Sequence, residues 1–149
     1  MRLSRSSAAW IQGATLIAAV AAITAVVAWE AREPFDRETL KIEVEQLQSH
    51  AAETGELVRN ANAQRLAPVF TRAHANQLAE KVHAVQSSLH SVAAIADLHQ
   101  AQVAAEAIAQ ALEQGLQAIA VDGRSADAAP FDGLAARSKA LAEQLAPDR

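Results

Sequence analysis

The stretch LKIEVEQLQSHAAETGELVRNA, residues 40–61, carries the pattern that decides the fold. Small or apolar residues recur in it at alternating steps of four and three, at Leu40, Val44, Leu47, Ala51, Thr54, Val58 and Ala61. This heptad spacing is typical of a helix that packs along its length against other helices. Asp36 is a suitable N-cap ahead of the pattern, and Pro34 interrupts any helix that precedes it. We therefore expect a helix over 36–66, with Gly55 as its weakest point.

Two further helical patterns follow Pro68, which is well placed as a first helical residue. The first comprises Leu78, Val82, Val85, Leu89, Val92 and Ala96, and the second comprises Leu98, Ala101, Ala105, Ile108, Leu112 and Ile119. The phase changes between them, although no glycine or proline marks the break. One helix over 69–121 would be about 80 Å long, far longer than its predicted neighbour. We therefore expect two helices, 69–96 and 98–121, with a turn near Asp97–Gln100 in the form of a capping box.

A final short helix is expected over 130–146, after a loop that begins at Gly123, a residue suited to ending a helix. Its apolar side comprises Phe131, Leu134, Leu141 and Leu145. Alanine makes up about a quarter of the chain, and no stretch alternates β-branched and polar residues as strands do. Short connections make neighbouring helices antiparallel. The sequence thus predicts an all-α fold over residues 34–149, an up-down-up-down bundle of about four helices.

An uncharged run, residues 8–29, precedes this domain and contains both tryptophans of the chain, Trp10 and Trp29. Their separation is about 28 Å along a helix, close to the ~30 Å of a bilayer's hydrocarbon core, and tryptophan favours the two membrane interfaces. We expect residues 1–33 to form a cytoplasmic head and a single transmembrane helix. A cleaved signal peptide is the alternative, but its apolar core would be only ~7–15 residues. Basic residues lie on both sides of the run, so the positive-inside rule alone does not decide the orientation. A short head followed by a long acidic domain favours a cytoplasmic N-terminus and a periplasmic C-terminal domain at the inner membrane.

Charge and composition exclude several classes of function. All 17 acidic residues but only 11 of the 13 basic residues follow Trp29, and this acidic balance argues against nucleic acid as a partner. The chain has no cysteine, which rules out disulfides and thiol chemistry. Hydrolase and phosphate-binding motifs are missing as well. We expect a non-enzymatic protein without a cofactor, whose partners are the membrane, other envelope proteins or its own copies.

Histidines are the best candidates for chemistry. A hairpin folded about Ala67 would set His50 opposite His83 and Glu43 opposite His90, and imidazole and carboxylate are ordinary ligands for zinc, nickel or copper. The same cluster could sense pH. However, ligands seven residues apart are about 10 Å apart along a helix, too far to share one metal ion. Solvated or half-buried structural histidines are therefore the competing interpretation.

The segment 82–121 carries only three charges, Asp97, Glu106 and Glu113, all of them acidic. An exposed helix usually carries more charge on its outer face. Either this alanine-rich segment is sunk in its own bundle, or it packs on another subunit or partner. The first hypothesis for function is thus a membrane-anchored helical interaction or scaffold protein. The alternative is a periplasmic metal- or ligand-responsive sensor that uses the histidines of the first hairpin.

Overall fold

The structure is a computed structural model that describes residues 36–91, 93–123 and 127–146. The chain divides into two units, Met1–Glu33 and Pro34–Arg149, and every described residue belongs to the second. The described residues form α2 (Arg37–Asn62), α3 (Pro68–Ser91), the short 3₁₀ helix η1 (Ala96–Leu98), α4 (His99–Asp122) and α5 (Ala129–Gln144), and they contain no strand. The predictions of an all-α fold and of about four helices are confirmed.

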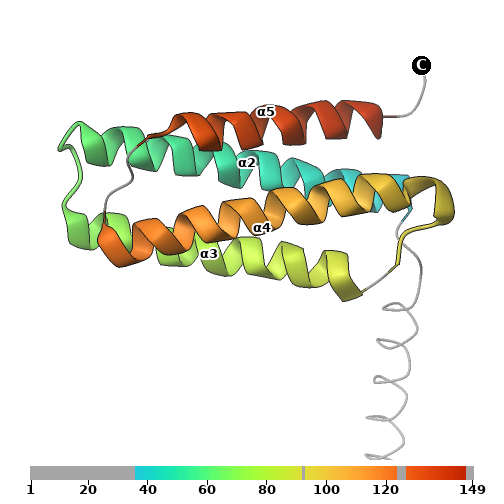
Figure 1. Cartoon of the computed structure of the whole chain (residues 1–149), viewed down its shortest axis with the longest axis horizontal. Helices are drawn as coiled ribbons and strands as arrows, with labels where there is room; N and C mark the ends of the chain where they lie inside the picture. The colour runs from blue at the N-terminus through green and yellow to red at the C-terminus, as the bar shows by residue number, and fades with distance from the viewer. Residues whose placement is uncertain (1–35, 92, 124–126, 147–149) are drawn as a thin grey trace, which may run out of the picture. The chain divides into compact units, whose positions relative to one another are not determined.

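Successive helices run in opposite directions, and each packs against the helix that follows it (Figure 1). The ring is closed by α5, which lies along α2 and also contacts α4. Leucine, isoleucine and valine side chains from all four helices meet in one core, and the largest fully buried ones are Leu40, Leu47, Leu78, Leu89, Leu112, Leu116 and Ile119. Most of the predicted apolar positions lie in this core, so the heptad patterns identified the inner faces correctly.

The ends of α2 follow from local chemistry. The carboxylate of Asp36 accepts a hydrogen bond of 2.7 Å from the backbone N–H of Thr39, as predicted for an N-cap, and this bond lowers the pKa of Asp36. The C-terminus of the helix comes earlier than residue 66, because Gln64 adopts a left-handed conformation with φ of 56°. The backbone N–H of Arg65 then donates to the carbonyl of Asn60. This arrangement is a Schellman motif with glutamine at the position that glycine usually occupies.

The turn between α3 and α4 was predicted at the wrong place. Helix α3 ends at Ser91 rather than at residue 96, and no side chain caps the start of η1 or of α4, so the predicted capping box at Asp97 does not form. The turn is held instead by Gln102, which is buried in α4. Its side-chain oxygen accepts a 2.9 Å hydrogen bond from the N–H of Ala94, and its side-chain nitrogen donates to the carbonyl of Leu89. One polar side chain thus connects the end of α3, the turn and the first turns of α4.

Two glycines allow α5 to pack closely on its neighbours. A Cβ atom at Gly115 of α4 would lie 2.5 Å from Cε1 of Phe131, and one at Gly55 of α2 would lie 2.8 Å from a carboxylate oxygen of Asp132. Asp132 also pairs with Arg59 of α2, at 2.8 Å between oxygen and nitrogen. Gly55 is therefore a packing position in α2 as well as a weak helix former.

The predicted membrane anchor, including Trp10 and Trp29, lies outside the described residues. Within the part of the chain that the structure describes, no helix combines the length and the apolar character needed to cross a bilayer.

Candidate functional site

The outer face of α4 is exposed and carries no charge over most of the helix. The exposed positions from residue 100 to residue 121 are Gln100, Val103, Ala107, Gln110, Ala111, Gln114, Gln117, Ala118 and Val121. Two of them are valines: Val103 is 50% exposed and Val121 is 76% exposed, as Ile42 of α2 (50%) and Val69 of α3 (66%) are on other faces of the bundle. This face is the strongest candidate for an interaction surface among the described residues.

Six of these residues form a regular row, here called the outer seam: Val103, Ala107, Gln110, Gln114, Gln117 and Val121. Their spacing of four, three, four, three and four is the heptad spacing of helices that pack side by side. Each residue of the outer seam follows a buried residue of η1 or α4 by five positions, a rotation of about 140° around the helix axis. The buried row comprises Leu98, Gln102, Ala105, Ala109, Leu112 and Leu116. Helix α4 therefore has heptad rows on two nearly opposite sides, and among the described residues only the inner one is buried.

The other three helices have ordinary charged outer faces. Exposed charged residues occur on α2 (Glu38, Glu45, Glu56), on α3 (Arg72, Glu80, Lys81) and on α5 (Asp132, Arg137, Lys139, Glu143). The two carboxylates in the middle of α4, Glu106 and Glu113, are partly buried beside histidines of α3. The low charge of residues 82–121 thus reflects two features. The inner side of the segment lies in the core, and the exposed positions of α4 between residues 100 and 121 carry no charged side chain.

Three histidines of α3 each lie beside a glutamate of a neighbouring helix. Nε2 of His74 is 2.9 Å from a carboxylate oxygen of Glu53 in α2, and the ring of Phe70 stacks on that of His74. Nδ1 of His83 is 3.4 Å from Glu113, and Nε2 of His90 is 4.0 Å from Glu106. The last two pairs have the same register, because His83 and His90 are seven residues apart on α3 and their partners are seven apart on the antiparallel α4. Each pair becomes an ion pair when its histidine is protonated.

His50 has a different environment, in a shallow depression of about 430 Å³ between α2 and α3. Its Nδ1 atom is buried without a hydrogen-bond partner among the described residues. Burial, and secondarily the positive charge of Lys81, lowers the pKa of His50, and Glu53 opposes this effect only in part. The ring is therefore held in its neutral form in the folded protein at neutral pH.

This environment predicts a loss of stability on acidification. The unfolded chain protonates His50 near pH 6.5, whereas the folded chain does so only at lower pH, so a falling pH favours the unfolded state. We expect the free energy of unfolding of the native chain to drop relative to that of His50→Leu as the pH is lowered from 7.5 to 5. Urea titrations across this range measure the difference, and Lys81→Met should reduce the drop. A difference that stays constant with pH would contradict the assignment.

The structure does not gather the four predicted metal ligands in one place. The carboxylate of Glu43 accepts a 2.7 Å hydrogen bond from the hydroxyl of Ser88 and, like His50, lines the depression between α2 and α3. His83 and His90 instead lie beside α4. Across residues 36–91, 93–123 and 127–146, no three histidine, aspartate or glutamate side chains are grouped as metal ligands. Metal binding by these residues stays a prediction.

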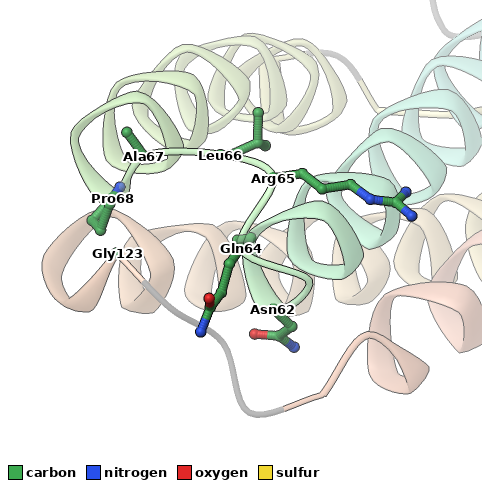
Figure 2. Close-up of a pocket in the computed structure, with 8 residues that line it drawn as sticks. Asn62, Gln64, Arg65, Leu66, Ala67, Pro68 and Gly123 are labelled. Atoms are coloured by element: carbon green, nitrogen blue, oxygen red, sulfur yellow. The ribbon is translucent and has the colours of Figure 1, made fainter.

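A second hollow, of about 560 Å³, lies where α2 ends and α3 begins (Figure 2). Gln64, Pro68 and Gly123 line it, and the side chain of Arg65 extends away from Pro68 and Gly123 in this view. Its described lining contains no carboxylate, histidine or hydroxyl group.

Two parts of this arrangement were missed from the sequence. The pairing of His83 and His90 with Glu113 and Glu106 could have been found, because a hairpin folded about residue 98 sets these positions opposite one another. The role of Gln102 gave no such signal, since a glutamine in a row of glutamines and alanines reads as a surface residue.

Neither protein-family models, curated proteins nor solved structures show a significant similarity to this chain. The described residues form an antiparallel four-helix bundle, a class of fold that does not by itself specify a function.

Proposed function

We propose that this chain is a non-enzymatic, membrane-anchored interaction or scaffold protein of the bacterial envelope, which assembles with its own copies or with other envelope proteins. The observation that carries the proposal is the uncharged, exposed outer face of α4. Solvent-facing helices usually carry charge, as α2, α3 and α5 do, whereas the buried part of protein interfaces is depleted of it. The exposed valines at the two ends of the outer seam support the same role.

The proposed location follows from the sequence of residues 1–33. An uncharged run of membrane-spanning length, with a tryptophan near each end, would hold the bundle at the inner membrane. The short head before the run and the long acidic domain after it favour a cytoplasmic N-terminus and a periplasmic bundle. A membrane-held domain needs little affinity for a partner in the same membrane, since tethering raises the effective concentration of both.

The alternative function, a metal- or ligand-responsive sensor, is less favoured by the geometry of the described residues. Its candidate ligands lie in different grooves of the bundle, and each histidine–glutamate pair supplies two ligands where a structural zinc site uses four. The interaction role draws instead on a continuous surface of a single helix.

The test is the native mass of the full-length chain, extracted from membranes in mild detergent with its neighbours attached. We expect a mass above that of one chain, and a return to the mass of one chain in the variant Ala107→Glu/Ala118→Glu. Both alanines are exposed, so the variant should keep the helical content and melting temperature of the native chain. Alanines that pack partly against the core, such as Ala94 and Ala104, are unsuitable for this test, because a glutamate there would also disturb folding.

The matched control is Ala73→Glu/Ala84→Glu, which adds two glutamates at the same eleven-residue spacing to exposed positions of α3. It should leave the native mass unchanged. A native chain that runs as a single copy at every concentration would rule out the proposal.

A further inference from the structure

We propose that the bundle opens in acid along the contact between α2 and α3, where the α3–α4 pair of helices parts from the α2–α5 pair when His50 is protonated. This inference concerns the conformation of the bundle and does not depend on the proposed interaction role. Its basis is the unequal packing of the four helices, the path of the chain between them, and the charged groups that lie at the contact.

The four helices pack as two close pairs. Helix α3 packs far more extensively along α4, and α2 along α5, than α2 does along α3, and the contacts of α4 with α5 and α2 are smaller still. The shallow depression of about 430 Å³ lies at this weaker contact, and we call it the α2–α3 groove; its lining comprises Glu43, Gln46, His50, Lys81, Ala84 and Val85. Separating the two pairs therefore breaks fewer contacts than dividing either pair.

The path of the chain allows such a movement. The two pairs are linked by the α2–α3 connection and by the α4–α5 connection, and both leave from the same end of the bundle (Figure 1). Gly123, which ends α4, lines the hollow at the α2–α3 connection together with Pro68. The connection at the opposite end joins α3 to α4 and lies within one pair. The pairs can therefore part at that end, with the linked end as the hinge.

His50 is the group in the groove whose charged form the closed bundle disfavours. Its Nδ1 atom is buried and has no hydrogen-bond partner among the described residues. Protonation makes both ring nitrogens donors, so the closed bundle would then hold a buried N–H group without an acceptor. The new charge would also be repelled by the ammonium group of Lys81, which lies on the other side of the groove. Opening the groove to water relieves both effects.

Carboxylates at the same contact act in the opposite sense. Glu53 of α2 attracts protonated His50, but its effect is smaller than those of burial and of Lys81. Glu53 also lies 2.9 Å from His74 of α3, and the two become an ion pair in acid. Glu43, the other carboxylate of the groove, accepts a hydrogen bond from α3. No residue of α4 or α5 lines the groove in the described part of the chain.

The positions of these groups indicate which part of the groove opens. His74 and Glu53 lie closer than His50 to the α2–α3 connection, so their ion pair holds the hinge end together. The two histidine–glutamate pairs between α3 and α4 also gain charge in acid, which keeps these helices joined. Acid thus weakens the half of the groove remote from the connection, and α3 and α4 move away from α2 as one unit.

The test is the distance between two spin labels in the full-length chain, which has no native cysteine. Ser49→Cys/Ser87→Cys places the labels at exposed positions of α2 and α3, and pulsed electron resonance in detergent measures their separation. As the pH falls from 7.5 to 5, we expect a second, longer distance to appear. Since one proton drives the opening, the ratio of open to closed forms should rise by up to about tenfold per pH unit below pH 6.5.

Two further label pairs locate the movement. Ser87→Cys/Gln110→Cys labels exposed positions within the α3–α4 pair and should keep a single distance at every pH. Ala52→Cys/Asn76→Cys labels exposed positions of α2 and α3 near the hinge end and should change less than Ser49→Cys/Ser87→Cys does. Circular dichroism at each pH checks that the helical content is unchanged.

Substitutions of His50 test its role as the trigger. His50→Leu cannot be protonated and should keep the short distance between positions 49 and 87 at pH 5. His50→Arg carries a charge throughout this range and should show the longer distance already at pH 7.5. His99→Leu, the same change at an exposed histidine outside the groove, is the matched control and should open as the native chain does.

Two results would overturn the inference. The first is a distance between positions 49 and 87 in the native chain that stays the same down to pH 5, or that lengthens equally in His50→Leu. The second is a distance between positions 87 and 110 that lengthens together with it, because the bundle would then unfold in acid as a whole instead of parting into two pairs.

Discussion

Replacing Gln102 by alanine is expected to lower the free energy of unfolding by about 2–4 kcal/mol. The substitution removes two hydrogen bonds at once and leaves the N–H of Ala94 and the carbonyl of Leu89 without this partner. Each buried polar group without a partner costs about 1–3 kcal/mol. The lost side chain also leaves a small void between α3 and α4, because Gln102 is only 6% exposed.

Urea unfolding followed by circular dichroism measures this effect. Gln102→Met keeps the approximate length of the side chain but not its polar atoms, so it separates the lost hydrogen bonds from the lost packing. Gln100→Ala, at an exposed position two residues earlier, should change stability by less than about 0.5 kcal/mol. A Gln102→Ala variant as stable as Gln100→Ala would show that the turn is held by other contacts.

Replacing Gly115 by alanine is expected to cost about 1–3 kcal/mol, although alanine is the better helix former. The added methyl group would lie 2.5 Å from one ring carbon of Phe131 and 2.8 Å from another, so the ring must move. Phe131 is 5% exposed in the core, where neighbouring side chains restrict that movement. The gain from removing a glycine inside a helix, about 0.5–1 kcal/mol, offsets only part of this cost.

The control is Gly133→Ala in α5, where a Cβ atom would meet nothing within 4 Å. This change should raise stability by about 0.5–1 kcal/mol, since only the helix preference remains. Combining Gly115→Ala with Phe131→Leu should recover part of the loss by making room for the methyl group. If Gly115→Ala and Gly133→Ala stabilise the chain equally, Phe131 does not depend on Gly115 for its position.

The inner face of each helix could be predicted from the sequence, because the buried side of a helix requires apolar or small residues at every third or fourth position. Leu40, Val44, Leu47, Ala51, Thr54 and Val58 are all buried, as the heptad pattern predicts. The helix ends were harder to predict where an unusual residue adopts the terminating conformation. Gly123 ends α4 with φ of 68°, as expected of glycine, whereas Gln64 does the same after α2 without the glycine that would reveal it.

The turn between α3 and α4 shows why the exact position of a connection between helices could not be predicted. The sequence indicates that a break exists, since the apolar phase changes, but the position of the break depends on which backbone groups Gln102 can reach. These hydrogen bonds join residues eight and thirteen positions apart, so they leave no pattern in the neighbouring sequence. The prediction for the histidines had a similar limit. The antiparallel direction of α2 and α3 was right, but the contacts Glu43–Ser88 and Glu53–His74 depart from the predicted register, and His83 and His90 lie on the flank of α3 that faces α4.

The pairing of α2 with α5 has a consequence for how the bundle is made. Arg59 and Asp132 are 73 positions apart in sequence, so this contact closes a long loop and forms only after the last helix is available. During synthesis, α2, α3 and α4 can associate locally, but the apolar flank of α2 that α5 covers stays open to solvent. Exposed apolar surface favours aggregation, so the interval before α5 docks is the stage of synthesis at which the chain is most open to it.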